Sequence, residues 1–309
     1  MTDGGQDAHL IDCAIVGAGV AGLSAALFLG RAGRSTVVFD DGSPRILVVD
    51  RVREFLGHDG EPPTDLLARE HREVLRYGVD VVSAQVDTIT PRPDGMFDVA
   101  TSDHMLTART IVLATGIVDE LPDIDGIQPV WGRDLHVCPC FDGHEFRDGP
   151  FVVIGEADRL AYFASWVWMW CHDVTVVSRH RFEGDDAERL SLLSIEVVSD
   201  EVASVVHEGE QLVAVRTATG RNIACNSIWA ALPWRAASGL AASLCDADDR
   251  GLAIVDAGGQ TSRPGVWAVG NASNAVAHLA HAAAAGTNVG PLVTLYLLER
   301  ELETRRRSR

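Results

Sequence analysis

The sequence predicts an α/β fold with two domains, each built from a parallel sheet between layers of helices. Residues 13–40 show an apolar strand, a glycine-rich turn, a helix rich in Ala and Leu, and a second strand. The same order recurs over residues 151–178. A chain of 309 residues is also too long for one simple core and suits two medium domains. These observations predict two Rossmann-like, three-layer nucleotide-binding domains.

The first repeat carries a complete dinucleotide-binding pattern. Gly17 allows the tight turn, Gly19 lets backbone N–H groups approach a pyrophosphate, and Gly22 lets helix and strand pack closely. The positive end of the helix dipole favours the phosphates. Asp40 ends the second strand, where it can accept hydrogen bonds from ribose hydroxyls. This full context favours a nucleotide site over an apolar unit with incidental glycines.

The second repeat has lost part of this pattern. Leu160 stands where the close-packing glycine is expected, and Glu156 and Asp158 place negative charge where a pyrophosphate would lie. Since every dinucleotide needs that phosphate contact, we expect poor NADPH binding. An opposing signal is typical of a 2′-phosphate site and comprises Ser178, Arg179, His180 and Arg181.

Charge and hydropathy exclude several classes of function. The net charge of -18 disfavours binding to nucleic acid or to anionic membranes. No apolar run is long enough for a transmembrane helix, and residues 1–9 do not resemble a signal peptide. We therefore expect a soluble protein of the cytoplasm, with a solvated, frayed basic tail at residues 305–309.

The sequence contains six cysteines, and two of them lie close together, in Cys138-Pro139-Cys140. A secreted disulfide framework is not expected in a chain of this size. Cys245 shows no pattern that indicates a role. Apolar strand-like surroundings predict small core residues at Cys13, Cys171 and Cys225.

Further strand and helix patterns indicate how the domains are arranged along the chain. Strand–glycine segments occur at residues 110–116 and 265–271, and an Ala-rich helix is predicted at 278–286. We expect a discontinuous FAD-binding domain of residues 1–116 and 236–309. The remaining residues, 117–235, are expected to form an inserted domain similar to an NAD(P)-binding domain, with a degenerate phosphate loop.

Several motifs in order resemble the low-molecular-weight thioredoxin-reductase-like FAD-dependent oxidoreductases, over nearly the whole chain. They are VGAGVAG, FDDGSPR, FLGHDGEPP, VLATGIVDELPDI, WGRDLHVCPCFDGHE and GVWAVGN. The resemblance implies FAD, a homodimer and a cysteine pair facing the flavin. The damaged second repeat is closest to one branch, the dithiol oxidases that close disulfides in secondary metabolites and pass electrons to oxygen.

The resemblance also implies a set of residues that contact the cofactor. Asn271 replaces the family's usual Asp, but an amide can still bond a hydroxyl of the FAD ribityl chain. His278 begins the last helix, where it can stabilise reduced flavin. The full set is Gly17, Gly19, Val20, Ala21, Gly22, Asp40, Asp41, Arg45, Ala114, Thr115, Gly116, Gly270, Asn271, His278 and Leu279.

The cysteine motif departs from the family pattern. Phe141 stands where the flavin-proximal cysteine is expected, and Cys140 comes one position early. In an extended chain residues i and i+2 point to the same side, so Cys138 and Cys140 can form a disulfide. The alternative is that both cysteines are relics. Asp142 occupies the family's acid/base position, although an Asp before Gly also favours a turn.

Other polar and aromatic side chains near these motifs allow two interpretations. His136 and His144 flank the cysteines and can shuttle protons or serve only packing. Trp166 and Trp170 share a helix face and favour core or subunit packing over a substrate platform. No spacing supplies enough convergent ligands, so we expect no metal site.

Three functions remain open from the sequence. The first is an FAD-dependent dithiol oxidase in which Cys138 and Cys140 exchange with a small-molecule dithiol, while Asp142 or a His handles protons. The second is an NADPH-dependent disulfide reductase that uses Arg179 and Arg181. The third is a flavin-binding partner or sensor without turnover.

Overall fold

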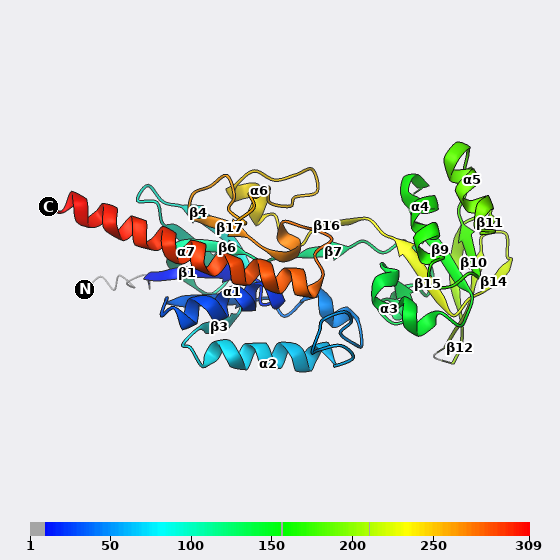
Figure 1. The fold of residues 1–309 in the computed structure, drawn as a ribbon, viewed down its shortest axis with the longest axis horizontal. Helices are drawn as coiled ribbons and strands as arrows, with labels where there is room; N and C mark the ends of the chain where they lie inside the picture. The colour runs from blue at the N-terminus through cyan, green and yellow to red at the C-terminus, as the bar shows by residue number, and fades with distance from the viewer. Residues whose placement is uncertain (1–9, 156, 210) are drawn as a thin grey trace. The chain divides into compact units, whose positions relative to one another are not determined.

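The structure, a computed structural model, describes residues 10–155, 157–209 and 211–309. The chain divides into two compact units (Figure 1). Unit 1 contains the residues through Leu47, Phe55–Val118 and Arg235–Arg309, and unit 2 contains Val48–Glu54 and Asp119–Trp234. The chain crosses between the units in strands β7 (Ile117–Asp119) and β16 (Trp234–Ala236), which pair with each other.

Unit 1 is built on a sheet with a parallel centre and the strand order β3-β2-β1-β6-β5-β4. One edge of β6 pairs with two different strands. Residues 105–108 pair antiparallel with β5, and residues 111–113 pair parallel with β17. Its other edge pairs in parallel with β1. The strands are β1 Leu10–Val16, β2 Thr36–Asp40, β3 Asp80–Ser83, β4 Val86–Pro91, β5 Phe97–Thr101, β6 Met105–Leu113 and β17 Val266–Ala268.

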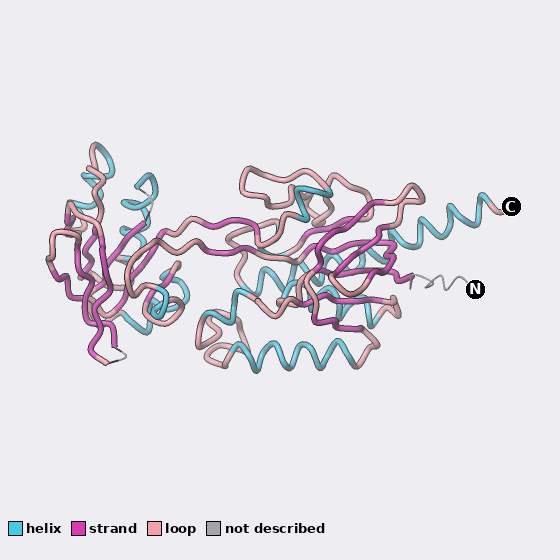
Figure 2. The backbone as a smooth tube through the Cα atoms, turned by 180° about the vertical axis from the view of Figure 1, so that it is seen from behind, coloured by secondary structure: helices cyan, strands magenta, loops and turns pink. Residues whose placement is uncertain are grey.

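Apolar packing on both faces of this sheet forms the core of unit 1. Helices α1, α2 and α7 pack on one face around Ile15, Val38 and Val112. β4, β5 and α6 pack on the other face around Val37 and Ile111. α2 lies beside β3 in both views (Figures 1 and 2). The helices are α1 Val20–Arg31, α2 Pro63–Leu75, α6 Leu240–Leu244 and α7 Leu279–Arg307, with short 3-10 helices at Arg45–Val48 and Gly270–Ala272.

The last helix is longer than the sequence predicted. We expected a helix over residues 278–286 and a frayed basic tail, but α7 continues to Arg307, so the expected fraying was wrong. Val289, Val293 and Leu297 recur every four residues and are buried against the sheet, which explains the extension. The basic residues of the last turn also suit the negative end of the helix dipole. None of the described helices, α7 included, is long and apolar enough to span a membrane.

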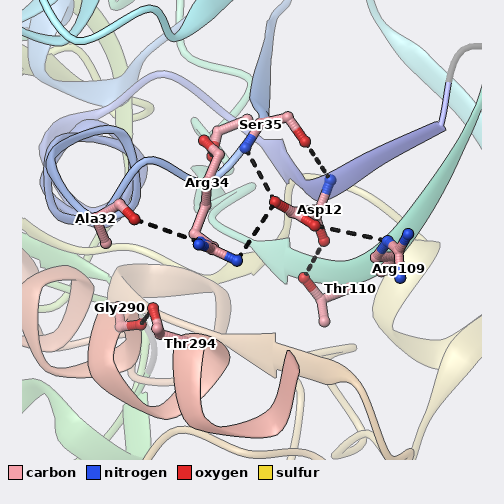
Figure 3. Close-up of polar contacts among 9 residues, drawn as sticks. Asp12, Ala32, Arg34, Ser35, Arg109, Thr110, Gly290 and Thr294 are labelled. Atoms are coloured by element: carbon pink, nitrogen blue, oxygen red, sulfur yellow. Dashed lines mark hydrogen bonds and ion pairs between the residues drawn. The ribbon is translucent and has the colours of Figure 1, made fainter. Parts of the chain in front are cut away.

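Asp12 joins three segments near the start of β1 (Figure 3). Its carboxylate accepts a hydrogen bond from the Ser35 backbone N–H at 3.1 Å and lies 3.5 Å from Arg109 Nε. The Ser35 hydroxyl accepts from the Asp12 N–H at 2.9 Å, and Thr110 Oγ1 donates to the Asp12 carbonyl at 2.7 Å. These bonds hold β1, the loop after α1 and β6 in register.

Unit 2 contains a parallel sheet of order β11-β10-β9-β15-β8 and an antiparallel sheet of order β12-β13-β14. α4 and α5 pack on one face of the parallel sheet, and the antiparallel strands pack on the other. The predicted two-sheet, Rossmann-like α/β architecture is therefore confirmed. The strands are β8 Leu135–His136, β9 Phe151–Gly155, β10 Val174–Val177, β11 Glu196–Val198, β12 Val202–Glu208, β13 Gln211–Thr217, β14 Asn222–Ala224 and β15 Ser227–Ala231. The helices are α3 Pro139–Phe146, α4 Ala157–Val167 and α5 Gly184–Leu192, with a short 3-10 helix at Gln128–Val130.

The units differ from the expected domains at one segment. We expected residues 1–116 to belong together, but Val48–Glu54 packs in unit 2. Val52 of this segment is only 1% exposed. Its neighbour Arg53 forms ion pairs with Asp142 and Glu145 of α3. These ion pairs connect the segment to α3 of unit 2.

Glu70 of α2 is an acid in a poorly solvated position. Its Oε2 atom is enclosed and has no hydrogen-bond partner among the described residues. Burial, followed by repulsion from Glu73, raises the pKa of the Glu70 carboxyl from its ordinary value of 4.5 to about 7. Between these two values the unfolded chain ionises Glu70 while the folded chain keeps it protonated. The residue therefore lowers stability as the pH rises through that window.

We expect Glu70→Gln to raise the free energy of unfolding by about 1–3 kcal/mol at pH 8 and to leave it unchanged at pH 4. Urea denaturation at the two pH values measures the difference. Glu299→Gln, on the exposed face of α7, is the matched control and should change little at either pH. If the Glu70 variant and the wild type have equal free energies of unfolding at pH 8, burial of the ionised Glu70 carboxylate does not destabilise the fold.

Candidate functional site

A cleft opens at the carboxyl ends of β1, β2 and β6 in unit 1. This is the edge of a parallel sheet at which α/β proteins bind ligands. The glycine turn after β1, the end of β2 and the segment after β6 form its walls. The cleft brings together most of the residues predicted to contact the cofactor, namely Gly17, Gly19, Val20, Ala21, Asp40, Asp41, Arg45, Ala114, Thr115, Gly116, Gly270, Asn271 and Leu279.

The three glycines of the turn have different structural roles. Gly17 has a φ of +108°, and a Cβ at this position would clash with the carbonyl oxygen of Ala114. A Cβ at Gly22 would clash with the Gly17 carbonyl, so Gly22 packs the helix against the turn. Gly19 caps α1, and a Cβ there would meet no described atom within 4 Å. Open space therefore lies at the positive end of the α1 dipole, where a phosphate group can bind.

Acidic side chains stand at the end of β2. Asp40 Oδ1 accepts a hydrogen bond from the Gly42 N–H at 3.0 Å, and Asp41 Oδ1 accepts one from the Ser43 N–H at 2.9 Å. These bonds form a compact turn that holds both carboxylates at the cleft. Ser43 and Pro44 also line the cleft; they lie in the FDDGSPR motif but were not predicted to contact the cofactor. No motif marks Gln85, Ala237 and Ser238, which line it as well.

Asn271 shapes the loop that leads into α7. Its side-chain amide donates hydrogen bonds to the carbonyl oxygens of Asn274 at 2.9 Å and Ala275 at 3.1 Å. The same loop carries Asn271 to the wall of the cleft. His278 is the N-cap of α7. His278 and Gly22 are the predicted residues that do not appear among the described residues lining this cleft.

Cys138 and Cys140 form a disulfide at the N-terminus of α3 in unit 2, with their Cα atoms 5.3 Å apart. Cys138 caps the helix, since its Sγ accepts a hydrogen bond from the Cys140 N–H at 3.3 Å. Pro139 occupies the first helical position, where no N–H is needed. Cys138 is buried, whereas Cys140 is only partly buried. Cys140 is therefore the more exposed residue of the pair.

Asp142 lies one helical turn after Cys138 and is held from two sides. Its Oδ2 is 3.1 Å from His136 Nδ1, and its Oδ1 is 3.5 Å from Arg53 Nε. Arg53 Nη1 also lies 3.3 Å from Glu145 Oε1. A partly buried cation and a buried imidazole thus fix this carboxylate on the helix face that carries Cys138. Sequence analysis gave no signal for Arg53, which lies in a distant segment.

Gly143 lets α3 approach Trp170 closely. A Cβ at Gly143 would lie 2.6 Å from the Trp170 ring. Trp170 also meets Trp166 edge-on, with ring centroids 6.2 Å apart, as their spacing predicts. Because Asp142 and Gly143 both lie inside α3, the turn considered as an alternative role for Asp142 does not form. Trp170 therefore packs α3 and helps to position its first turn.

The corresponding sheet edge in unit 2 forms a second cleft, at the ends of β9, β10 and β15. Leu160 is fully buried at the position of the missing glycine, and Asp158 is exposed in the first turn of α4. Glu156, the other acid expected here, lies outside the described residues. Arg179, expected to meet a 2′-phosphate, instead lies 2.6 Å from Glu201 Oε1 on the wall of this cleft.

The other cysteines are poor nucleophiles. Burial raises the pKa of the Cys13 thiol and of the Cys225 thiol to about 12. Burial also raises the pKa of Cys171 and of Cys245. All four stay protonated at neutral pH, and a protonated thiol is unreactive. The predicted core positions of Cys13, Cys171 and Cys225 are confirmed.

We expect Gly143→Ala to lower the free energy of unfolding by about 1–2 kcal/mol, because overpacking against Trp170 outweighs the gain in helix propensity. Thermal unfolding followed by tryptophan fluorescence measures the loss. Gly239→Ala is the control, since a Cβ there meets no described atom within 4 Å. If both variants melt at the wild-type temperature, the close contact between α3 and Trp170 is wrong.

Known proteins resemble this chain in sequence and in structure. Residues 11–286 match the family described as "Pyridine nucleotide-disulphide oxidoreductase". The structure named "Crystal structure of HlmI" superposes with a TM-score of 0.92 and 32% identity, covering 100% of this chain and 98% of that chain. The "Thioredoxin reductase" of Treponema pallidum is 28% identical over 274 residues, covering 84% of this chain and 88% of that protein.

A partial match adds to these similarities. The "Probable thioredoxin reductase" of Arthroderma benhamiae is 31% identical over 154 residues, which cover 48% of this chain and 38% of that protein. The family match, by contrast, extends over both units of the structure. This chain therefore belongs to the pyridine nucleotide-disulphide oxidoreductase family and is an oxidoreductase of the thioredoxin-reductase type.

Proposed function

We propose that this chain is an FAD-dependent dithiol oxidase that closes a disulfide in a small-molecule secondary metabolite, with oxygen as the electron acceptor. The observation that carries the proposal is the Cys138–Cys140 disulfide at the start of α3, with Asp142 one turn later. An oxidised cysteine pair is the form that takes electrons from a substrate dithiol. We also propose that the protein acts as a homodimer, as the family resemblance implies.

The cleft of unit 1 fits FAD. Open space beside Gly19 suits the pyrophosphate, and Asp40 ends β2 where a ribose would lie. The loop held by Asn271 supplies a further polar wall. These residues would hold the cofactor. The chemistry that FAD would supply there is the acceptance of two electrons from thiols and their transfer to oxygen, with hydrogen peroxide as the product.

An NADPH-dependent disulfide reductase is the second candidate, because Arg179 stands at the cleft of unit 2. Several features of that cleft oppose it. Leu160 fills the space that close approach of a phosphate loop requires, and Asp158 adds negative charge there. A 2′-phosphate would also have to displace Glu201 from Arg179. These features support the oxidase over the reductase.

Thiol–disulfide exchange at the cysteine pair follows from its geometry. The sulfur of Cys140, the more exposed residue, is the one that a substrate thiolate can attack, which releases the Cys138 sulfur. The Cys140 N–H and the positive end of the α3 dipole stabilise the released thiolate. The second substrate thiol then displaces the Cys140 sulfur. The substrate leaves as a disulfide, and both enzyme cysteines end as thiols.

We expect a small dithiol such as dithiothreitol to bleach the flavin absorbance of the anaerobic holoprotein, and air to restore it. NADPH should cause no comparable bleaching. Cys138→Ser and Cys140→Ser should each abolish the response to dithiol, while Cys245→Ser, at a partly buried cysteine outside the pair, should keep it. The visible spectrum recorded in each state is the measurement. Bleaching by NADPH alone would move the protein to the reductases, and no bleaching by either would indicate a flavin-binding partner.

We expect Gly19→Ala to weaken FAD retention by about tenfold or more, because the new methyl group fills the space reserved for the pyrophosphate. The melting temperature of the apoprotein should change little, since no described atom lies near that position. Flavin fluorescence released on dilution measures retention. Gly239→Ala, which is equally open but lies outside the lining of the cleft, is the control. Full retention by the Gly19 variant would place the pyrophosphate elsewhere.

A further inference from the structure

Aromatic side chains enclose His136 beside the cysteine pair. The residue is 4% exposed, and its ring stacks on Trp229 with centroids 4.8 Å apart and an interplanar angle of 29°. Phe146 of α3 packs against it at the same centroid distance. Its Nδ1 lies 3.1 Å from Asp142 Oδ2, while Nε2 is buried and has no partner among the described residues. Within the described chain, the imidazole therefore directs its polar contact to Asp142.

In this enclosure only Nδ1 faces a hydrogen-bond partner among the described residues. With the proton on Nδ1, the ring donates to Asp142 and leaves one unpartnered lone pair. The ring cannot easily turn, because Trp229 is itself fully buried and donates its Nε1–H to Ser227 Oγ at 2.9 Å.

A phenyl ring would fill the same enclosure without leaving a buried nitrogen unpartnered. Buried polar groups without partners are rare in folded proteins because each one costs stability. What a histidine supplies at this position is its hydrogen bond to Asp142. The hydrogen bond to the Asp142 carboxylate is thus what the structure gains in return for the unpartnered Nε2 atom of His136.

The charged groups that face this pair come from two elements. α3 supplies Asp142 and Glu145, and the segment Val48–Glu54 supplies Arg53, which bridges both carboxylates. The side chain of Asp142 is 14% exposed. Since His136 engages one of its oxygens and Arg53 faces the other, the carboxylate cannot rotate away from the helix face that it shares with Cys138.

We propose that His136 is a positioning residue for thiol–disulfide exchange at Cys138–Cys140: it fixes the Asp142 carboxylate where that group can take up and return protons. The inference rests on the proposed function. In the first exchange, the substrate sulfur bonds to Cys140, the bond between the cysteines breaks, and the substrate's proton passes through Asp142 to the Cys138 sulfur. In the second, the other substrate thiol displaces the Cys140 sulfur, which receives its proton. The substrate loses two electrons and two protons, and the cysteine pair gains both.

The test compares His136→Phe, which keeps an aromatic ring but removes the donor, with His136→Asn, which keeps a donor near Nδ1. His144→Phe, at an exposed histidine of α3, the helix that carries Asp142, is the matched control. The first readout is the stopped-flow rate at which dithiothreitol reduces the disulfide of the anaerobic holoprotein, as a function of pH. The second is iodoacetamide alkylation of the reduced protein, assigned to Cys138 and Cys140 by mass spectrometry.

We expect His136→Phe to slow reduction by about tenfold at neutral pH, in the range of a misplaced acid–base group. The pH midpoint of Cys138 alkylation should also shift by about half a unit or more, because a neighbouring carboxylate has moved. His136→Asn should recover most of the rate, and His144→Phe should match the wild type. Combined with Asp142→Asn, His136→Phe should add no further loss, since both substitutions act on one carboxylate.

A His136→Phe protein with the wild-type rate and alkylation midpoint would overturn the inference, as would losses that simply add to those of Asp142→Asn. If the phenylalanine variant does not fold, His136→Met, which also lacks a donor, takes its place. Exchange and alkylation do not require turnover with oxygen. If the wild type exchanges with dithiol but stays reduced in air, the proposed oxidase function is wrong. The role of His136 is then still decided by the rate of disulfide reduction and by the pH midpoint of Cys138 alkylation.

Discussion

The carboxylate of Asp142 joins three segments of unit 2 that are separate in the chain. His136 comes from β8, Arg53 from the segment Val48–Glu54, and Asp142 itself from α3. A carboxylate this poorly exposed is tolerated only when hydrogen bonds and an opposite charge compensate it. Because these partners hold the first turn of α3, they also hold the cysteines that begin it. The position of the cysteine pair therefore depends on these polar contacts as well as on the packing of Gly143 against Trp170.

The same backbone plan yields two unlike clefts, and a few side chains cause the difference. In unit 1, Gly22 lets α1 lie against the turn, so that space remains beside Gly19. In unit 2, Leu160 fills the core at the matching position, and Glu201 neutralises the nearby Arg179. These differences in volume and charge favour a phosphate group at the cleft of unit 1 over one at the cleft of unit 2. Shared topology fixes where a ligand can bind but not whether it does.

Local patterns predicted the architecture and much of the first cleft, because Gly19 and Asp40 belong to a single strand–helix–strand unit whose spacing places both at one sheet edge. Local sequence patterns could not predict contacts between residues that are far apart in the chain. The ion pair between Arg53 and Asp142 joins residues 89 positions apart, and no local sequence pattern predicts such a contact. His136 was visible beside the cysteines, but its enclosure depends on the pairing of β8 with β15. The length of α7 was missed because burial of Val289, Val293 and Leu297, rather than propensity, stabilises the middle of this helix.

The segment Val48–Glu54 makes the inserted unit incomplete as a genetic module. Residues 119–234 leave and rejoin unit 1 through paired strands, an arrangement that resembles a clean insertion. Yet a gene fragment for those residues alone would encode Asp142 and Glu145 without the arginine that bridges them. It would also lack Val52, a buried residue of unit 2. An exchange of this domain between relatives would therefore carry over the Arg53 ion pairs only if the stretch of the gene that encodes Val48–Glu54 moved with it.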